Sequence, residues 1–194
     1  MTLLPEVSAD EIPPAVPGAG AEEADLVRAA AAGDAQAFAQ LVRRQSGRVF
    51  NFIHQMTRHR QDAEDLTQQT FLKVHRHLGR FDPGRPLINW LFVIARRTVL
   101  NHFRSAPLWE QVPEGTASPG PSPAAAAEGR DEAEDLWEQA RAALPQRDFE
   151  VLWLRFGEEL STKETARIVG LTETHVKVLV HRARQVLTKK RPRS

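Results

Sequence analysis

The sequence contains no cysteine, which excludes disulfides, thiolate zinc sites and a cysteine nucleophile. It also lacks a long apolar segment: the longest strongly apolar run is the six residues from Trp90 to Ala95, whereas a membrane helix needs about 20. The first 20 residues contain no basic segment followed by an apolar one, as a signal peptide would. We therefore expect a cytoplasmic protein with no membrane partner.

Catalytic motifs are absent as well. The sequence has no glycine-rich phosphate loop and no HExxH pattern, and the histidines between residues 54 and 77 show no regular ligand spacing with nearby acids. Asp62, Glu64 and Asp65 suggest a metal site, but the helix dipole and capping favour carboxylates at a helix start in any case. We expect no enzymatic activity, no cofactor and no metal.

Helical periodicity covers most of the chain and no strand pattern occurs, so the predicted fold class is all-α with two small helical domains. The predicted organisation is a disordered acidic arm at 1–23, a domain at 24–105, a flexible Pro/Ala/Gly/Ser linker at 106–131 and a domain at 132–194 with a basic tail. The arm and the linker contain too little apolar surface to offset chain entropy. Predicted helices before residue 161 cover 25–32, 34–58, 62–78, 87–104, 131–143 and 145–156.

Residues 161–184, STKETARIVGLTETHVKVLVHRAR, indicate two short helices around a tight turn. Ser161 and Glu164 have the spacing of a capping box. Gly170 can take the left-handed conformation that ends the first helix, and Thr172 can cap the second. This pattern predicts a helix-turn-helix, a motif that binds duplex DNA.

The second of these helices has two distinct faces. Apolar residues that recur at helical spacing predict its buried face: Val176, Leu179, Val180, Ala183 and Leu187. The same spacing turns polar residues and one valine outward, where they can meet base edges and phosphates: Thr174, Lys177, Val178, His181 and Gln185, flanked by Arg182 and Arg184. The alternative is a capped helical hairpin in an ordinary bundle.

Charge is nearly balanced over the chain, with 26 Lys and Arg against 25 Asp and Glu, but it is unevenly placed. Residues 161–194 carry nine basic and two acidic residues, and residues 72–105 carry seven and one. Residues 1–30 and 106–135 have net charges of −5 and −6. Two basic segments indicate two contacts along one polyanion. For the last five residues the alternative is a solvated tail.

The helix at 90–104 is predicted to combine a core face with a nucleic-acid face. The expected core residues are Leu91, Phe92, Ala95, Val99 and Phe103. The opposite stripe carries Trp90, Arg97, Asn101 and Arg104, an aromatic, an amide and cations that suit an unpaired base and its backbone. The alternative is that Trp90 belongs to the core and the arginines are simply solvated.

The helix at 62–78 is predicted to present a polar face with one exposed leucine. Its expected buried residues are Ala63, Thr67, Phe71, Val74 and Leu78, which leaves Asp65, Gln68, Gln69, Leu72 and Arg76 outside. An exposed leucine within such a face suits a protein docking surface, although single exposed leucines are also normal.

Five segments together resemble a bacterial sigma factor of the extracytoplasmic-function (ECF) group in the sigma-seventy family. They occur in family order over residues 24–188: LVRAAAAGDAQAFAQLVRRQ, DAEDLTQQTFLKVHRHLGRF, INWLFVIARRTVLNHFRS, ALPQRDFEVLWLRFGEELS and the helix-turn-helix. Their order and their spacing around the linker make the resemblance more specific than a lone helix-turn-helix.

The resemblance implies that residues 24–105 are sigma domain 2. In that domain DAEDLTQQTF docks on the clamp helices of core RNA polymerase, with expected contacts from Asp65, Gln68, Gln69 and Leu72. The loop 81–88 and the helix after it read the minus-ten promoter element, which is melted and has a non-template base flipped into a pocket. The expected contacts there are Trp90, Arg97, Asn101 and Arg104.

The resemblance also implies that residues 132–194 are sigma domain 4, which rests on the polymerase flap and reads the minus-thirty-five element as duplex promoter DNA. The expected DNA-binding residues are Thr174, His175, Lys177, Val178, His181, Arg182 and Arg184, the last on phosphate. The linker runs toward the RNA exit path, and an anti-sigma factor occludes the polymerase-facing surfaces. Many relatives have Asn at the position of Arg97 and Glu at the position of Gln69. The resemblance therefore does not specify which base is read at minus ten or the charge of the docking face.

The predicted function is therefore an alternative sigma factor that binds core RNA polymerase and directs promoter-specific initiation in a stress or envelope response. The alternative is a stand-alone helix-turn-helix repressor or activator. That protein would be dimeric and would bind a palindromic site without polymerase.

Overall fold

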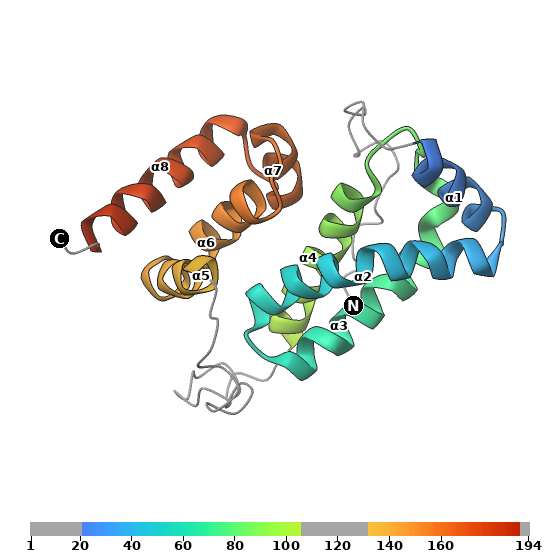
Figure 1. The fold of residues 1–194 in the computed structure, drawn as a ribbon, viewed down its shortest axis with the longest axis horizontal. Coiled ribbons are helices and arrows are strands. Elements are labelled where there is room, and N and C mark those ends of the chain that lie inside the picture. The colour runs from blue at the N-terminus through green and yellow to red at the C-terminus, as the bar shows by residue number, and fades with distance from the viewer. Residues whose placement is uncertain (1–20, 106–131, 191–194) are drawn as a thin grey trace. The chain divides into compact units, whose positions relative to one another are not determined.

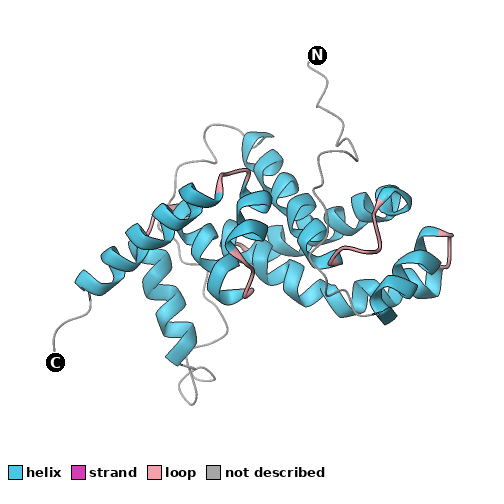
Figure 2. Cartoon of the chain, turned by 90° about the horizontal axis from the view of Figure 1, so that it is seen from above, coloured by secondary structure: helices cyan, strands magenta, loops and turns pink. Residues whose placement is uncertain are grey.

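The computed structural model describes residues 21–105 and 132–190 of the 194-residue chain. Within these two ranges every regular element is a helix or a helical turn and none is a strand (Figures 1 and 2). The all-α prediction is confirmed. Most of the predicted acidic arm, the predicted linker at 106–131 and the end of the basic tail at 191–194 lie outside the described residues.

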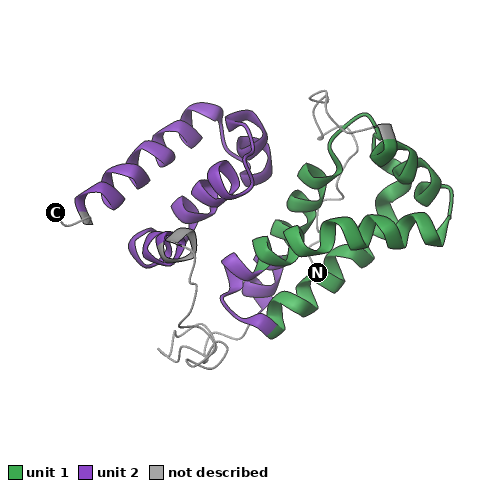
Figure 3. Cartoon of the chain, viewed as in Figure 1, with its two compact units in different colours: residues 1–53, 61–98 green, residues 54–60, 99–194 purple. Residues whose placement is uncertain are grey.

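The chain divides into two compact units, residues 1–53 with 61–98 and residues 54–60 with 99–194 (Figure 3). The predicted domain boundary at 106–131 falls outside the described residues, and it stays a prediction. In the described part of the chain, no helix has the length and apolar character needed to cross a membrane.

The first four helices are α1 (Ala21–Ala31), α2 (Ala35–Thr57), α3 (Arg60–His77) and α4 (Leu87–Ser105), and a 3₁₀ turn, η2 (Leu78–Arg80), extends α3. Their core includes Phe52 of α2 and Phe92 of α4, both fully buried, with ring centres 5.0 Å apart. Burying such large rings contributes strongly to the stability of this unit.

The turn between α1 and α2 forms as the sequence predicts. Gly33 has φ +101°, a conformation that ends α1 and is costly for residues with a Cβ. The Asp34 carboxylate accepts hydrogen bonds from the amides of Gln36 and Ala37 at 2.8 and 3.1 Å. It therefore satisfies two of the amides that the start of α2 leaves without a helical partner.

Two helix starts differ from the prediction. Residues 21–23, predicted as the end of the arm, form the first turn of α1. There Glu22 pairs with Arg44 of α2, and Glu23 accepts from Gln45 Nε2 at 2.9 Å. These partners are distant in sequence, so composition could not reveal them. Similarly, α3 begins at Arg60 rather than after a cap at Asp62, which lies in its first turn.

The remaining helices are α5 (Glu132–Ala143), α6 (Gln146–Leu152), α7 (Thr162–Val169) and α8 (Glu173–Lys190), with a π-helical turn, η4 (Trp153–Gly157), after α6. The predicted helix at 145–156 is thus divided. A side chain at Gly157 would place its Cβ 3.0 Å from the Trp153 ring, so a glycine permits this close approach. The core here includes a cluster of Ala140, Leu144, Phe149, Leu152 and Ala183, with Trp137, Trp153, Val186 and Leu187 packed against it.

Candidate nucleic-acid and protein interfaces

The helix-turn-helix has the predicted caps. Ser161 Oγ accepts from the Glu164 amide at 3.2 Å, and the Glu164 carboxylate accepts from the Ser161 amide at 2.8 Å, which completes the capping box. Gly170 ends α7 with φ +69°. Thr172 Oγ1 accepts from the His175 amide at 3.2 Å at the start of α8. Local capping therefore sets both the end of α7 and the start of α8.

The outward face of α8 is also as predicted. Of the predicted buried face, Val176, Leu179 and Ala183 are buried, and Val180 and Leu187 are partly buried. The opposite face is exposed along its length and carries Thr174, His175, Lys177, Val178, His181, Arg184 and Gln185. Val178 is 55% exposed, although it is a large apolar side chain. An exposed helix face that mixes cations, hydrogen-bonding groups and one apolar contact suits the major groove of DNA.

Arg182 differs from the other predicted DNA contacts because it has a partner inside the protein. Its Nε and Nη2 donate to Asp148 Oδ2 and Oδ1 of α6 at 2.8 and 2.6 Å. Asp148 is 2% exposed, and these hydrogen bonds raise the pKa of Arg182. The expectation that Arg182 reads bases took no account of this partner, which sequence spacing could not indicate.

A basic pocket of about 260 Å³ adjoins the outward face of α8. Its lining includes Lys177, His181 and Arg184 from α8 and Arg155 and Phe156 from η4, with no acidic residue. The Arg155 and Arg184 guanidinium carbons lie 5.6 and 5.0 Å from the centre of the Phe156 ring, within cation–π range. Sequence reasoning missed Arg155 and Phe156. Their position shortly before the capped helix pair was the available signal.

The face predicted on α4 is partly wrong. Trp90 is 6% exposed, and its ring stacks on Phe81 with centres 4.9 Å apart, so it does not lie on the exposed side of α4 as predicted. Phe103, an expected core residue, is 40% exposed. The first half of α4 is apolar almost all round, so its helical wheel does not define one outward side, and the loop before it covers the side with Trp90.

The polar part of that face does reach the surface. Arg97 and Arg104 are exposed and Asn101 is partly exposed. Arg104 Nη1 donates to Asn101 Oδ1 at 3.3 Å, so these two side chains lie together on one side of α4.

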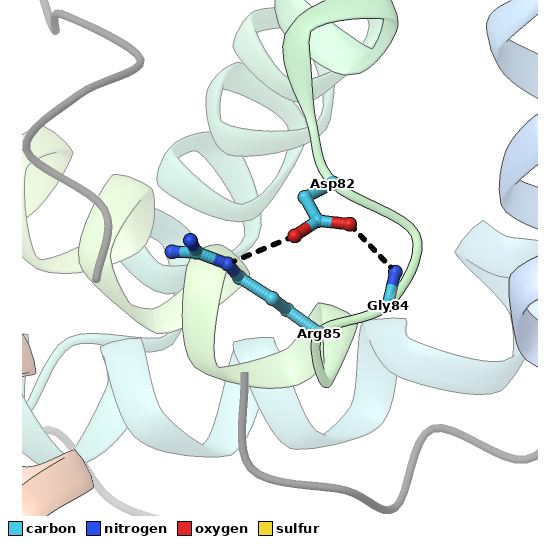
Figure 4. Close-up of polar contacts among 3 residues, drawn as sticks. All are labelled: Asp82, Gly84 and Arg85. Carbon is cyan, nitrogen blue, oxygen red and sulfur yellow. Dashed lines mark hydrogen bonds and ion pairs between the residues drawn. The ribbon is translucent and has the colours of Figure 1, made fainter. Parts of the chain in front are cut away.

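The loop between η2 and α4 is held by Asp82 (Figure 4). Its carboxylate accepts from the Gly84 amide at 2.9 Å and from Arg85 Nε at 3.2 Å. Aspartate commonly stabilises a turn by bonding to an amide two residues on. The loop that leads into the basic face of α4 therefore has a defined shape.

The outward face of α3 matches the prediction. Asp65, Gln68, Gln69 and Leu72 are exposed, and Leu72, at 61%, is the most exposed large hydrophobic residue in the described ranges. The buried side differs in detail, because Leu66 and Thr70 are buried and Thr67 is only partly so. Thr70 can be buried because its hydroxyl group has a hydrogen-bond partner within the helix: its Oγ1 donates to the Leu66 carbonyl at 2.7 Å.

A second groove, of about 700 Å³, lies between α5 and α8. Its lining is largely apolar and includes Leu136, Trp137, Leu152, Phe156 and Leu187. Leu136 is half exposed. Among residues 21–105 and 132–190, no group of three His, Asp or Glu side chains could hold a metal ion.

These faces suit a helical DNA-binding protein, with a helix-turn-helix in one unit and a leucine-bearing polar face in the other. Residues 41–107 match the family described as Sigma-70 region 2, and residues 135–187 match Sigma-70, region 4. The ECF RNA polymerase sigma factor BldN of Streptomyces coelicolor is 35% identical over 188 residues, which cover 92% of this chain and 69% of BldN. The chain belongs to the ECF group of sigma-70 factors and is an alternative sigma factor.

Other relatives agree with this assignment. The RNA polymerase sigma factor YlaC of Bacillus subtilis is 29% identical over 150 residues, which cover 75% of this chain and 87% of YlaC. The solved structure of the sigma factor RpoE with the anti-sigma factor NepR from Bartonella quintana has a TM-score of 0.65 at 25% identity and covers 78% of this chain and 94% of that one. Sigma factors are initiation factors rather than enzymes, and a stand-alone repressor or activator is not favoured.

Proposed function

We propose that this sigma factor divides promoter recognition between two helices. In this proposal α8 reads the minus-thirty-five element as duplex through Lys177, Val178 and His181, with Thr174 and His175 at its start. Arg184 and Arg155 line the basic pocket beside that face and contact phosphate. The observation that carries the proposal is the exposed, capped and cationic face of α8, which has the composition that major-groove readers use.

The minus-ten element is assigned to α4 and the loop before it. Arg97, Asn101 and Arg104 supply exposed or partly exposed cations and an amide, and Asp82 holds the loop before α4 in a defined turn. Trp90 has no direct contact in this proposal, because its ring is buried on Phe81. Its contribution is to support the backbone from which the exposed residues project.

Core RNA polymerase docks on the exposed face of α3 in this proposal, with Leu72 at its centre and Asp65, Gln68 and Gln69 around it. An exposed leucine with a polar rim resembles the composition of transient protein interfaces. The apolar groove between α5 and α8 offers a second contact, to the polymerase flap. RpoE in the solved complex is bound to an anti-sigma factor, and we extend that mode of control, and a cytoplasmic location, to this chain.

Transcription with purified core polymerase tests these assignments on a pool of promoters randomised at both elements. The expected result is enrichment of two short motifs at a fixed spacing, and only when polymerase is present. A palindromic site bound tightly by the isolated chain, with no effect on start-site choice, would instead establish the stand-alone repressor.

A further inference from the structure

We propose that Arg182 is a positioning residue, whose ion pair with Asp148 sets how the reading helix α8 sits on α6. The inference rests on the proposed function of α8 and changes the role expected for Arg182 from base contact to support. In this arrangement the base contacts fall to the neighbouring exposed side chains, chiefly Lys177, Val178 and His181.

The geometry of the Arg182–Asp148 pair restrains both the distance and the orientation of α8 relative to α6. Two parallel hydrogen bonds, at 2.8 and 2.6 Å, join the flat guanidinium to both oxygens of one carboxylate across 34 residues of sequence. A bidentate pair of this kind fixes orientation as well as distance. A single hydrogen bond would still allow the helix to rotate about it.

Burial explains why Arg182 is held in this way. The Asp148 carboxylate is almost wholly buried, whereas the Arg182 side chain is 56% exposed. A buried carboxylate that loses its cation is strongly disfavoured, so releasing Arg182 to a DNA base would leave Asp148 without that partner. The pair therefore opposes the extended conformation that a base-reading arginine needs.

The location of Arg182 on α8 makes the pair relevant to reading. The next residue, Ala183, is fully buried in the core of this unit, and the preceding residue, His181, is exposed on the outward face. Arg182 thus lies on the boundary between the packed face and the reading face. The apolar stripe restrains α8 through non-directional packing, and the ion pair adds a directional restraint at this boundary.

The test compares base-preference profiles of the full-length chain with core polymerase on the randomised promoter pool. The variants are Asp148→Asn, Arg182→Gln, their combination, and Lys177→Gln as a matched control on the reading face. Asp148 has no access to DNA, which makes it the decisive position. Thermal unfolding of each variant reports stability separately.

We expect Asp148→Asn and Arg182→Gln each to reduce selectivity by about tenfold, the size of one mismatched base pair, spread over several positions of the minus-thirty-five element. The double variant should be no worse than either single variant, because both remove the same pair. The minus-ten profile should stay unchanged, and Lys177→Gln should combine additively with Asp148→Asn. Arg182→Lys, which keeps the charge without the fork, should recover only part of the loss.

Two results would overturn the inference. If Arg182→Gln changes preference at one or two adjacent base pairs while Asp148→Asn leaves the profile intact, Arg182 reads bases directly. If both variants lower the unfolding temperature while the active fraction keeps the wild-type profile, the pair only stabilises the fold. Failure of the wild-type chain to select any minus-thirty-five motif would instead refute the proposed function of α8.

Discussion

Helices α4 and α8 are both basic and both predicted to contact DNA, yet they use their side chains in opposite ways. Each helix has one large apolar residue on its predicted DNA-facing side. On α8 this residue, Val178, is exposed, whereas on α4 it is Trp90, which is buried against Phe81. The cations differ as well. The basic residues Arg97 and Arg104 of α4 and Lys177 and Arg184 of α8 are all exposed, but Arg182 of α8 donates two hydrogen bonds to the buried Asp148.

The comparison of α4 with α8 shows when a helical wheel correctly predicts which side of a helix is exposed. Along α8 the apolar residues recur at helical spacing on one side and the polar residues occupy the other, so its exposed face can be predicted from the sequence. The first half of α4 is apolar on most sides, and its orientation depends on which neighbouring elements cover it. Exposure of an aromatic on such a helix is decided by packing rather than by spacing.

Trp90→Ala has the largest expected effect on stability and tests whether the aromatic residue of α4 is buried. Removing a buried ring that stacks on Phe81 should destabilise the first unit by about 3–5 kcal/mol, measured by denaturant unfolding followed by circular dichroism. Trp90→Phe, which keeps an aromatic ring, should lose much less. Unchanged stability in Trp90→Ala, together with impaired promoter melting, would favour an outward, base-stacking ring instead.

Leu72→Asp sharpens the comparison by testing an outward apolar residue in the same unit as Trp90. Because Leu72 is 61% exposed, stability should change by less than about 0.5 kcal/mol, while affinity for core polymerase should fall by about 2 kcal/mol or more if it is a central anchor. Co-purification or fluorescence binding measures the loss. His77→Asp, another exposed substitution on α3, is the control, and full retention of binding by Leu72→Asp would remove α3 from the docking surface.

Val178→Ala tests whether the exposed apolar residue of α8 contacts DNA. An exposed apolar side chain in the major groove is suited to the thymine methyl group. We expect wild-type protein to lose about 1 kcal/mol of affinity when one thymine of the selected minus-thirty-five element is replaced by uracil, and the variant to be indifferent to that replacement. Equal responses of both proteins at every thymine would show that Val178 does not contact that methyl group.

Ser161→Ala has the smallest expected effect and bears on how α8 is presented. Loss of the cap should reduce stability of the second unit by about 1 kcal/mol, measured by thermal unfolding, and should lower activity at both strong and weak promoters alike. Ser161→Asp, which keeps an acceptor, should be close to wild type. A change confined to one base preference would contradict a purely capping role.

Much of the α8 site could be predicted from sequence, because its determinants are local. Ser161, Gly170 and Thr172 act within three or four residues of the positions that they cap, and the exposed face follows from regular spacing of Val176, Leu179 and Ala183. The exposed face of α3 with Leu72 followed from the same kind of spacing. These features require only helix geometry, which the chain carries in its order of residues.

The contacts that sequence reasoning missed are those between residues that only folding brings together. The sequence alone determined the all-α fold class, the helix-turn-helix with its caps, and the outward faces of α3 and α8. Tertiary structure alone decided that Phe81 stacks on Trp90, that Glu23 bonds to Gln45, and that Arg182 pairs with the buried Asp148. The reason is physical: capping and periodicity act through neighbouring residues, whereas burial and buried ion pairs depend on which distant side chains share one small volume.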